Sequence, residues 1–174
     1  MTMSDLSRPD PVRTRTLSAA FLAVAMAAVV LSALGFEHIG GYIPCALCLL
    51  QRVPYYIGAP LMLIAALLSL FRGPSWAVRG LLAIGGLLML YGLGYAIYHS
   101  GVEWHWWAGP ASCTNTAAGV TTDAGSLLGD LNSKKPPSCD EAVFRLFGLS
   151  FAGWNVLVSA ALAVIAFRGA MTRG

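Results

Sequence analysis

The chain contains four apolar stretches that lack any charged residue, and this pattern limits its possible folds more than any other feature. The stretches are residues 17–36, 53–71, 80–98 and 146–167. A helix needs roughly 20 apolar residues to cross the ~30 Å hydrocarbon layer of a bilayer. None of the stretches shows the strict alternation of a membrane barrel strand. The sequence therefore predicts an all-α integral membrane protein, a four-transmembrane-helix bundle that forms a single membrane domain over residues 1–174.

The composition agrees with a membrane location. Of the 174 residues, 57% are hydrophobic and 11% are charged, whereas soluble domains have roughly 45–50% apolar and about 25% charged residues. The first stretch follows Arg13 and Arg15, as a secretory signal would, but it is longer than the ~7–15 apolar residues of a cleaved signal. We therefore interpret it as the first membrane span.

Glycines and prolines within the spans indicate how the helices pack. Pro54 and Pro60 remove helix hydrogen bonds near the start of the second span, which could open a side pocket toward the lipid. Glycine lets helices approach closely because it has no side chain. Such close approach is predicted at four glycines of the third span: Gly85, Gly86, Gly92 and Gly94.

Positive residues predict the orientation, because lysine and arginine beside a span are retained on the cytoplasmic side. Those near the termini and in the turn between the second and third spans are Arg8, Arg13, Arg15, Arg72, Arg79, Arg168 and Arg173. We therefore expect both termini in the cytoplasm and the loops 37–52 and 99–145 in the periplasm. Six of the eight acidic residues lie in these loops: Glu37, Glu103, Asp123, Asp130, Asp140 and Glu141. The net charge of +3 then reflects topology, and we expect no nucleic-acid partner.

All four cysteines fall in the two predicted periplasmic loops, where disulfides form and persist in bacteria. A structural zinc site commonly takes its ligands from two closely spaced pairs, but only Cys45 and Cys48 are close in the sequence. We therefore expect no metal site. Free buried thiols fit the polar loop sequence poorly. A structural disulfide is the ordinary interpretation of Cys113 and Cys139 when that pair is taken alone.

The pair Cys45 and Cys48 suggests redox chemistry. Pro44 suits the first position of a helix, and a helix that starts there would hold both sulfurs one turn apart at its positive end, which stabilises a thiolate. Arg52 would lie on the same face, one turn further along. Two interpretations of Arg52 remain open: it extends to the headgroup level as membrane arginines often do, or it polarises a ligand at the membrane edge.

Three stretches carry a resemblance to a known family. "FEHIGGYIPCALCLLQR" is similar to the first periplasmic loop of the bacterial disulfide bond formation protein B (DsbB) family, with its Pro-Cys-x-x-Cys and the arginine four residues later. "YHSGVEWHWWAGPASCT" and "SCDEAVFRLFGLSFAGWN" resemble the two cysteine-bearing parts of the second loop. The resemblance covers nearly the whole chain.

This resemblance implies a protein-dithiol:quinone oxidoreductase of the bacterial inner membrane, which reoxidises a periplasmic DsbA-like thiol oxidase and passes the electrons to a quinone in the lipid bilayer. The partner would attack Cys113 of a disulfide with Cys139, and Cys139 would then attack Cys45. Cys48 would be released as a thiolate beside the quinone, and Arg52 would stabilise the negative charge. Ubiquinone is favoured over menaquinone as the cofactor. The long loop, rich in glycine, proline, threonine and serine, fits a mobile role.

Two further points stay open at this stage. The resemblance places His99 beside the quinone head, although a histidine at a helix end has a simpler explanation in the helix dipole. His38 and His105 are expected to be ordinary interfacial residues, and the tryptophans at 104, 106 and 107 to form an aromatic belt. The alternative function is a non-enzymatic membrane scaffold whose outer loop is held by a static disulfide.

Overall fold

Four long helices make up most of the computed structural model, which describes residues 10–110, 113, 139–142 and 144–172. They are α1 (Pro11–His38), α2 (Ala46–Leu70), α3 (Ser75–Glu103) and α6 (Phe151–Met171). Each is long and apolar enough to cross a membrane, so the predicted all-α class and the four spans are confirmed. The predicted mobile segment between Cys113 and Cys139 lies outside the described residues.

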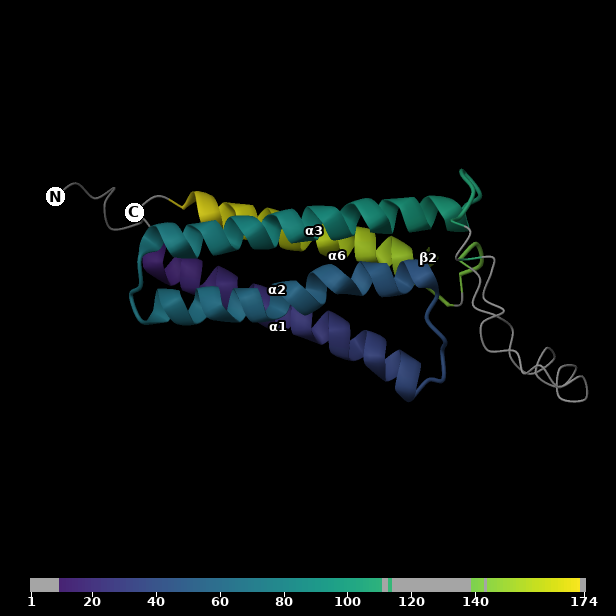
Figure 1. Cartoon of the computed structure of the whole chain (residues 1–174), viewed down its shortest axis with the longest axis horizontal. Helices are drawn as coiled ribbons and strands as arrows, with labels where there is room; N and C mark the ends of the chain where they lie inside the picture. Colours follow the sequence, from purple (N-terminus) through teal and green to yellow (C-terminus); the bar gives the residue numbers. More distant parts are fainter. Residues whose placement is uncertain (1–9, 111–112, 114–138, 143, 173–174) are drawn as a thin grey trace, which may run out of the picture.

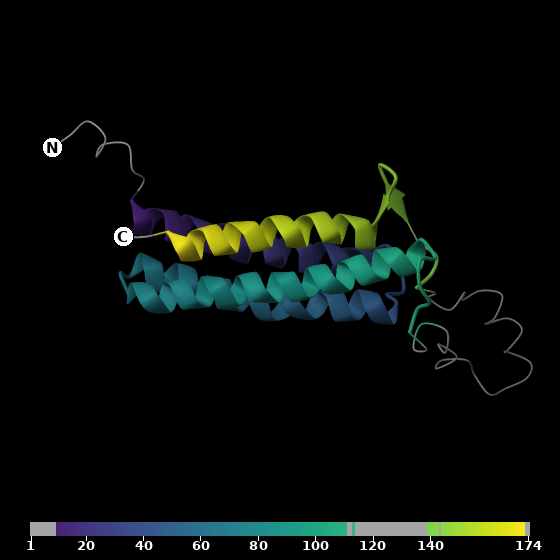
Figure 2. The ribbon, with the colours of Figure 1, turned by 90° about the horizontal axis from the view of Figure 1, so that it is seen from above.

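The helices form an elongated bundle in which the chain runs back and forth along one axis (Figure 1). The start of α1 and the end of α6 lie at one end, and the connections from α1 to α2 and from α3 to α6 lie at the other (Figures 1 and 2). We call the latter the cysteine end, because Cys45, Cys48, Cys113 and Cys139 gather there. Toward this end α1 diverges from α2 (Figure 1).

The core runs along the bundle axis and is built from side chains of all four helices. Its fully buried members include Leu22, Met26, Tyr55, Met62, Leu82, Met89 and Ala166. At the end opposite the cysteines, arginine side chains bind the last carbonyls of α6. Arg15 donates to the Thr172 carbonyl at 2.6 Å and Arg79 donates to the Ala170 carbonyl at 2.8 Å. These contacts satisfy groups that a helix end leaves without partners.

The glycine prediction is confirmed at three of its four positions. Gly94 is the exception, because a methyl group added there meets no atom within 4 Å. At the other three, an added methyl group would press on a side chain of a neighbouring helix: Gly85 on Met62, Gly86 on Phe167 and Gly92 on Pro54.

The second charge-free run is part of a longer helix. α2 begins at Ala46, seven residues before that run starts at Val53, so Cys48 and Arg52 lie within α2. The helix also continues through Pro54 and Pro60. The reason for the early start is a cap: Cys45 precedes the helix and its Sγ accepts a hydrogen bond from the Cys48 backbone N–H at 3.3 Å. Pro44 thus lies before the cap and not at the first helical position.

The other ends also differ from the prediction. α3 continues to Glu103, five residues beyond the charge-free stretch. α6 begins at Phe151, because residues 145–150 form a short antiparallel hairpin of β1 (Arg145–Leu146) and β2 (Leu149–Ser150). Its two turn residues, Phe147 and Gly148, have φ of +51° and +84°, as a tight hairpin turn requires. The Ser150 hydroxyl then caps α6 by accepting from the Gly153 N–H.

Candidate active site

The first cysteine pair is a dithiol at the start of α2. Cys45 is buried and Cys48 is partly exposed, and both are free. Their sulfurs lie 2.8 Å apart and share a hydrogen bond. In this bond the Cys45 thiol donates to the Cys48 sulfur, and the backbone N–H of Cys48 donates back to Cys45 Sγ at 3.3 Å. The predicted placement of both sulfurs one turn apart at the start of a helix is therefore confirmed, although the helix starts at Ala46, two residues later than expected.

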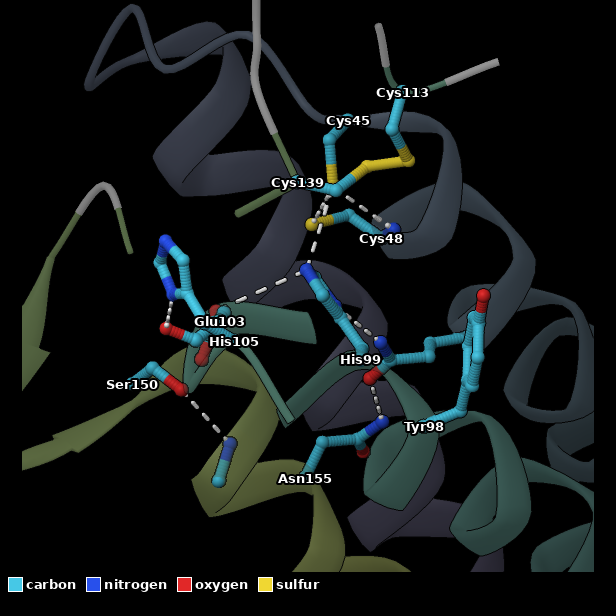
Figure 3. A network of polar contacts seen from close by, with 12 residues as sticks. Cys45, Cys48, Tyr98, His99, Glu103, His105, Cys113, Cys139, Ser150 and Asn155 are labelled. Atoms are coloured by element: carbon cyan, nitrogen blue, oxygen red, sulfur yellow. Dashed lines mark hydrogen bonds and ion pairs between the residues drawn. A yellow bond between two sulfur atoms is a disulfide. The ribbon is translucent and has the colours of Figure 1, made fainter. Parts of the chain in front are cut away.

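The second pair, Cys113 and Cys139, forms a disulfide. Both residues are buried, and they pack in one apolar cluster with Cys45, Leu47 and Val102 (Figure 3). Residues that are far apart in the sequence thus bring all four sulfurs to the same end of the bundle. This arrangement has what thiol–disulfide exchange requires, a dithiol and a disulfide as close neighbours.

His99 connects the dithiol to the interior of the bundle. Its ring is buried in α3, with its Nε2 atom 3.8 Å from Cys45 Sγ and 3.8 Å from Glu103 Oε1 (Figure 3). Its Nδ1 atom lies 2.7 Å from the Gln51 side-chain nitrogen. The predicted interfacial helix-end residue is therefore a buried residue of the site. His38 and His105 are exposed, as expected of interfacial residues.

The polar contacts continue beyond His99, and the sequence interpretation missed them. Asn155 of α6 donates to Gln51 Oε1 at 2.6 Å, and the Tyr55 hydroxyl donates to Asn155 Oδ1 at 2.5 Å. Ser159 lies 2.8 Å from the same hydroxyl. Isolated polar residues at positions 51, 155 and 159 within apolar runs were the available signal, since a polar side chain in a span usually faces a partner inside the bundle.

A cavity of about 420 Å³ opens beside the dithiol, lined mainly by apolar residues of α1, α2 and α6. This volume lies within the ~300–1,000 Å³ typical of small-molecule sites. Cys48 lines the cavity, whereas Cys45 does not. Among the polar residues of the wall are Arg52 and His99. Of the two sulfurs, Cys48 is therefore the one that lines a ligand-sized space. Pro54 and Pro60, from which a side pocket was predicted, are not among the lining residues of this cavity.

Arg52 has a partner that neither sequence interpretation included. Its guanidinium donates to Glu37 Oε2 at 2.5 Å. The two side chains are 14% and 28% exposed and both line the cavity. The positive charge is thus already paired at the wall of the cavity, and a ligand that uses Arg52 has to compete with Glu37 or share the guanidinium with it.

The surroundings of Cys45 favour its ionised form. The hydrogen bond with Cys48 lowers the pKa of the Cys45 thiol to about 4, with a further contribution from His99 and against the opposite effect of burial. Of the two thiols, Cys45 is the one whose surroundings lower the pKa. A thiolate is the form that attacks a disulfide.

The site also contains a possible donor set for a metal ion. The ligand atoms of Cys45, Cys48 and His99 all lie within 4.8 Å of one another. Two thiolates bound at ~2.3 Å to a tetrahedral zinc ion would be about 3.8 Å apart, whereas these sulfurs lie 2.8 Å apart. The sulfurs are spaced for a dithiol that closes to a disulfide, and we assign no metal to them.

A membrane bundle that holds a reactive dithiol beside a disulfide has the architecture of a disulfide-forming membrane oxidoreductase. The family model described as "Disulfide bond formation protein DsbB" matches residues 15–168. The chain therefore belongs to the DsbB family, as its sequence resemblance predicted, and it is a multi-pass bacterial membrane protein of disulfide bond formation. Comparison with curated proteins gave no match, and comparison with solved structures gave none.

Proposed function

We propose that the protein oxidises the dithiol of a periplasmic DsbA-like thiol oxidase and passes the electrons to a membrane quinone. The observation that carries the proposal is the difference between the two cysteine pairs. The Cys113–Cys139 disulfide is the oxidised pair, and the free pair presents one sulfur, Cys48, to a ligand-sized apolar cavity. A static scaffold needs neither a second, free pair nor such a cavity.

The exchange steps follow from the chemistry of the four sulfurs. A thiolate of the reduced partner attacks Cys113, and the Cys113–Cys139 bond breaks to give a mixed disulfide. When the other pair is oxidised, the released Cys139 thiolate attacks Cys45, and Cys48 leaves as a thiolate. Attack by the second partner thiol on the mixed disulfide frees the oxidised partner and the Cys113 thiolate. The Cys113 thiolate then attacks Cys139, which re-forms the Cys113–Cys139 disulfide and releases Cys45, so that Cys45 and Cys48 are left reduced. Each sulfur–sulfur bond that forms replaces one that breaks, so exchange alone needs no external oxidant.

A quinone supplies the two-electron acceptor that restores the Cys45–Cys48 disulfide, and the net reaction converts a dithiol and a quinone to a disulfide and a quinol. The residues present fit such a group. The cavity wall is mainly apolar, which suits a ring and an isoprenoid tail, and Arg52 and His99 lie on the same wall as Cys48. Arg52 would hold the ring and stabilise negative charge on it.

The proposed location is the bacterial inner membrane, with the cysteine end in the periplasm. Its support is the distribution of arginines: Arg15, Arg72, Arg79 and Arg168 all lie toward the opposite end of the bundle. Positive residues are retained on the cytoplasmic side, and exchange with a periplasmic partner requires sulfurs on the other side.

The test is an assay with purified protein in lipid nanodiscs, a reduced DsbA-like partner and either ubiquinone or menaquinone. We expect one quinol for each partner disulfide formed, with ubiquinone as the better acceptor. Cys48→Ser should abolish quinol formation while leaving the Cys113–Cys139 disulfide able to form the adduct with the partner. An unchanged quinone spectrum with the wild-type protein would refute the proposal and favour a non-enzymatic scaffold.

A further inference from the structure

Hydrogen bonds run without interruption from the middle of the bundle to the dithiol. The Tyr55 hydroxyl donates to Asn155, the Asn155 amide nitrogen donates to Gln51, and the Gln51 amide nitrogen lies 2.7 Å from His99 Nδ1. Figure 3 shows Asn155 and His99, two members of this relay. Three helices contribute to it: α2, α3 and α6. No step of the sulfur exchange uses Asn155 or Gln51, so their role has to be sought in what they do to His99.

The donor and the acceptor of each bond to His99 follow from its neighbours on both sides of the ring. An amide side chain has one oxygen that accepts and one nitrogen that donates. Because the oxygen of Gln51 accepts from Asn155, its nitrogen is left to donate to His99 Nδ1. On the other side of the ring, Nε2 faces two acceptors, the Cys45 sulfur and the Glu103 carboxylate. A proton on Nε2 and a lone pair on Nδ1 satisfy all three neighbours of the ring: Gln51, Cys45 and Glu103.

The carboxylate beside Nε2 strengthens this conclusion. Glu103 is 7% exposed, and its Oε2 atom has no hydrogen bond among the described residues. A buried carboxylate in this condition attracts the nearest N–H. The nearest ring nitrogen is Nε2 of His99, to which Oε1 is 3.8 Å distant. A proton is therefore favoured on Nε2, which faces Cys45 and Glu103, and disfavoured on Nδ1, which faces Gln51.

We propose that Asn155 and Gln51 are positioning residues that hold His99 as the neutral Nε2–H tautomer, so that its imidazole donates to Cys45 whenever that sulfur carries negative charge. The inference rests on the proposed function, in which Cys45 has to be a thiolate when it closes the disulfide with Cys48. Gln51 and Asn155 act only through His99. The ring donates as a fixed dipole and does not give up its proton.

The relay predicts which substitutions matter. Gln51→Glu keeps the size of the side chain but removes its donor, and a carboxylate at this position would draw a proton onto Nδ1. Asn155→Leu removes the group that orients Gln51. Ser100→Ala is the matched control: Ser100 neighbours His99 in the chain, and its buried hydroxyl has no hydrogen bond among the described residues.

The test reads the tautomer directly by NMR of protein with ¹⁵N-labelled histidine, in a His38→Gln, His105→Gln background where His99 is the remaining histidine. We expect protonated Nε2 and unprotonated Nδ1 in this background and in Ser100→Ala. Protonated Nδ1 is expected in Gln51→Glu, and a mixture of tautomers in Asn155→Leu. Protonated Nδ1 in the background protein, or a tautomer that neither variant changes, would overturn the proposal.

A second measurement follows the consequence for sulfur chemistry. A hydrogen bond to a charged group is worth enough to change a rate by about tenfold or more. Gln51→Glu and Asn155→Leu should therefore slow closure of the Cys45–Cys48 disulfide about tenfold, measured with a small disulfide oxidant and no quinone, while Ser100→Ala closes at the normal rate. Normal closure rates in both relay variants would refute the proposal.

Neither readout uses quinone or partner, so failure of this inference is separate from failure of the proposed function. If Gln51→Glu does not fold, Asn155→Leu decides both outcomes.

Discussion

At the scale of single residues, the site separates two tasks between neighbouring sulfurs. Cys45 is buried and its surroundings lower the pKa of its thiol, whereas Cys48 lines the cavity. Cys45 is thus kept away from the cavity, and Cys48 faces it. Among the described residues, Cys48 and His99 lower the pKa of Cys45, and Arg52 is paired with Glu37.

The low pKa of Cys45 predicts how its alkylation depends on pH. An ordinary thiol has a pKa of about 8.5, whereas the hydrogen bond with Cys48 lowers that of Cys45 to about 4. Because the folded value lies below the ordinary one, Cys45 should stay ionised at neutral pH and lose its charge as the pH falls through about 4. Alkylation by iodoacetamide, followed by peptide mass spectrometry, should show this midpoint. A midpoint near 8.5 would contradict it.

The ion pair of Arg52 and Glu37 predicts opposite effects of two substitutions on the KM for quinone. Glu37→Gln removes the competing charge but keeps the shape, so it should lower the KM severalfold, in line with the ~1 kcal/mol or less of a partly exposed ion pair. Arg52→Met should raise the KM. Steady-state quinol formation measures both. If neither variant changes the KM, Arg52 serves only its ion pair with Glu37.

At the scale of the helices, close packing depends on glycine at particular positions. Gly86→Ala should lower the free energy of unfolding by about 1–3 kcal/mol, because the new methyl group would lie 2.8 Å from the Phe167 ring. Gly94→Ala is the matched control on the same helix: it meets no neighbouring atom and should be neutral or slightly stabilising, because alanine favours helices over glycine. Thermal unfolding in detergent compares the two. Equal losses would refute the packing explanation.

The sequence predicted the number and class of the helices but not their ends. Charge-free runs locate the hydrocarbon core, whereas a helix ends where its backbone groups find other partners. The Cys45 sulfur and the Ser150 hydroxyl supply these partners at the starts of α2 and α6. The proximity of Cys45 and Cys48 could be predicted because they are close in sequence. The contacts of Gln51 with His99 and Asn155 could not, since they join residues 48 and 104 positions apart.

At the scale of the whole molecule, the bundle separates two chemically different ends. One end holds the four sulfurs, the buried carboxylate of Glu103 and the hairpin, and the other holds the arginines that bind the last carbonyls of α6. Helices of 21 to 29 residues lie between them. Because membrane insertion follows the positive residues, the same arginines that close the end of the bundle would also decide which side of the membrane receives the sulfurs.

This link predicts opposite accessibility of the two ends in intact cells. Ile39 at the cysteine end is 92% exposed, and Trp76 at the opposite end is 77% exposed. A maleimide that cannot cross the inner membrane should label Ile39→Cys and leave Trp76→Cys unlabelled until the cells are opened, as read by peptide mass spectrometry. The reverse result would place the sulfurs in a reducing compartment, where the Cys113–Cys139 disulfide would not persist and exchange with a periplasmic partner could not occur. The redox chemistry therefore depends on the arginines at the far end of the molecule as much as on the residues beside the sulfurs.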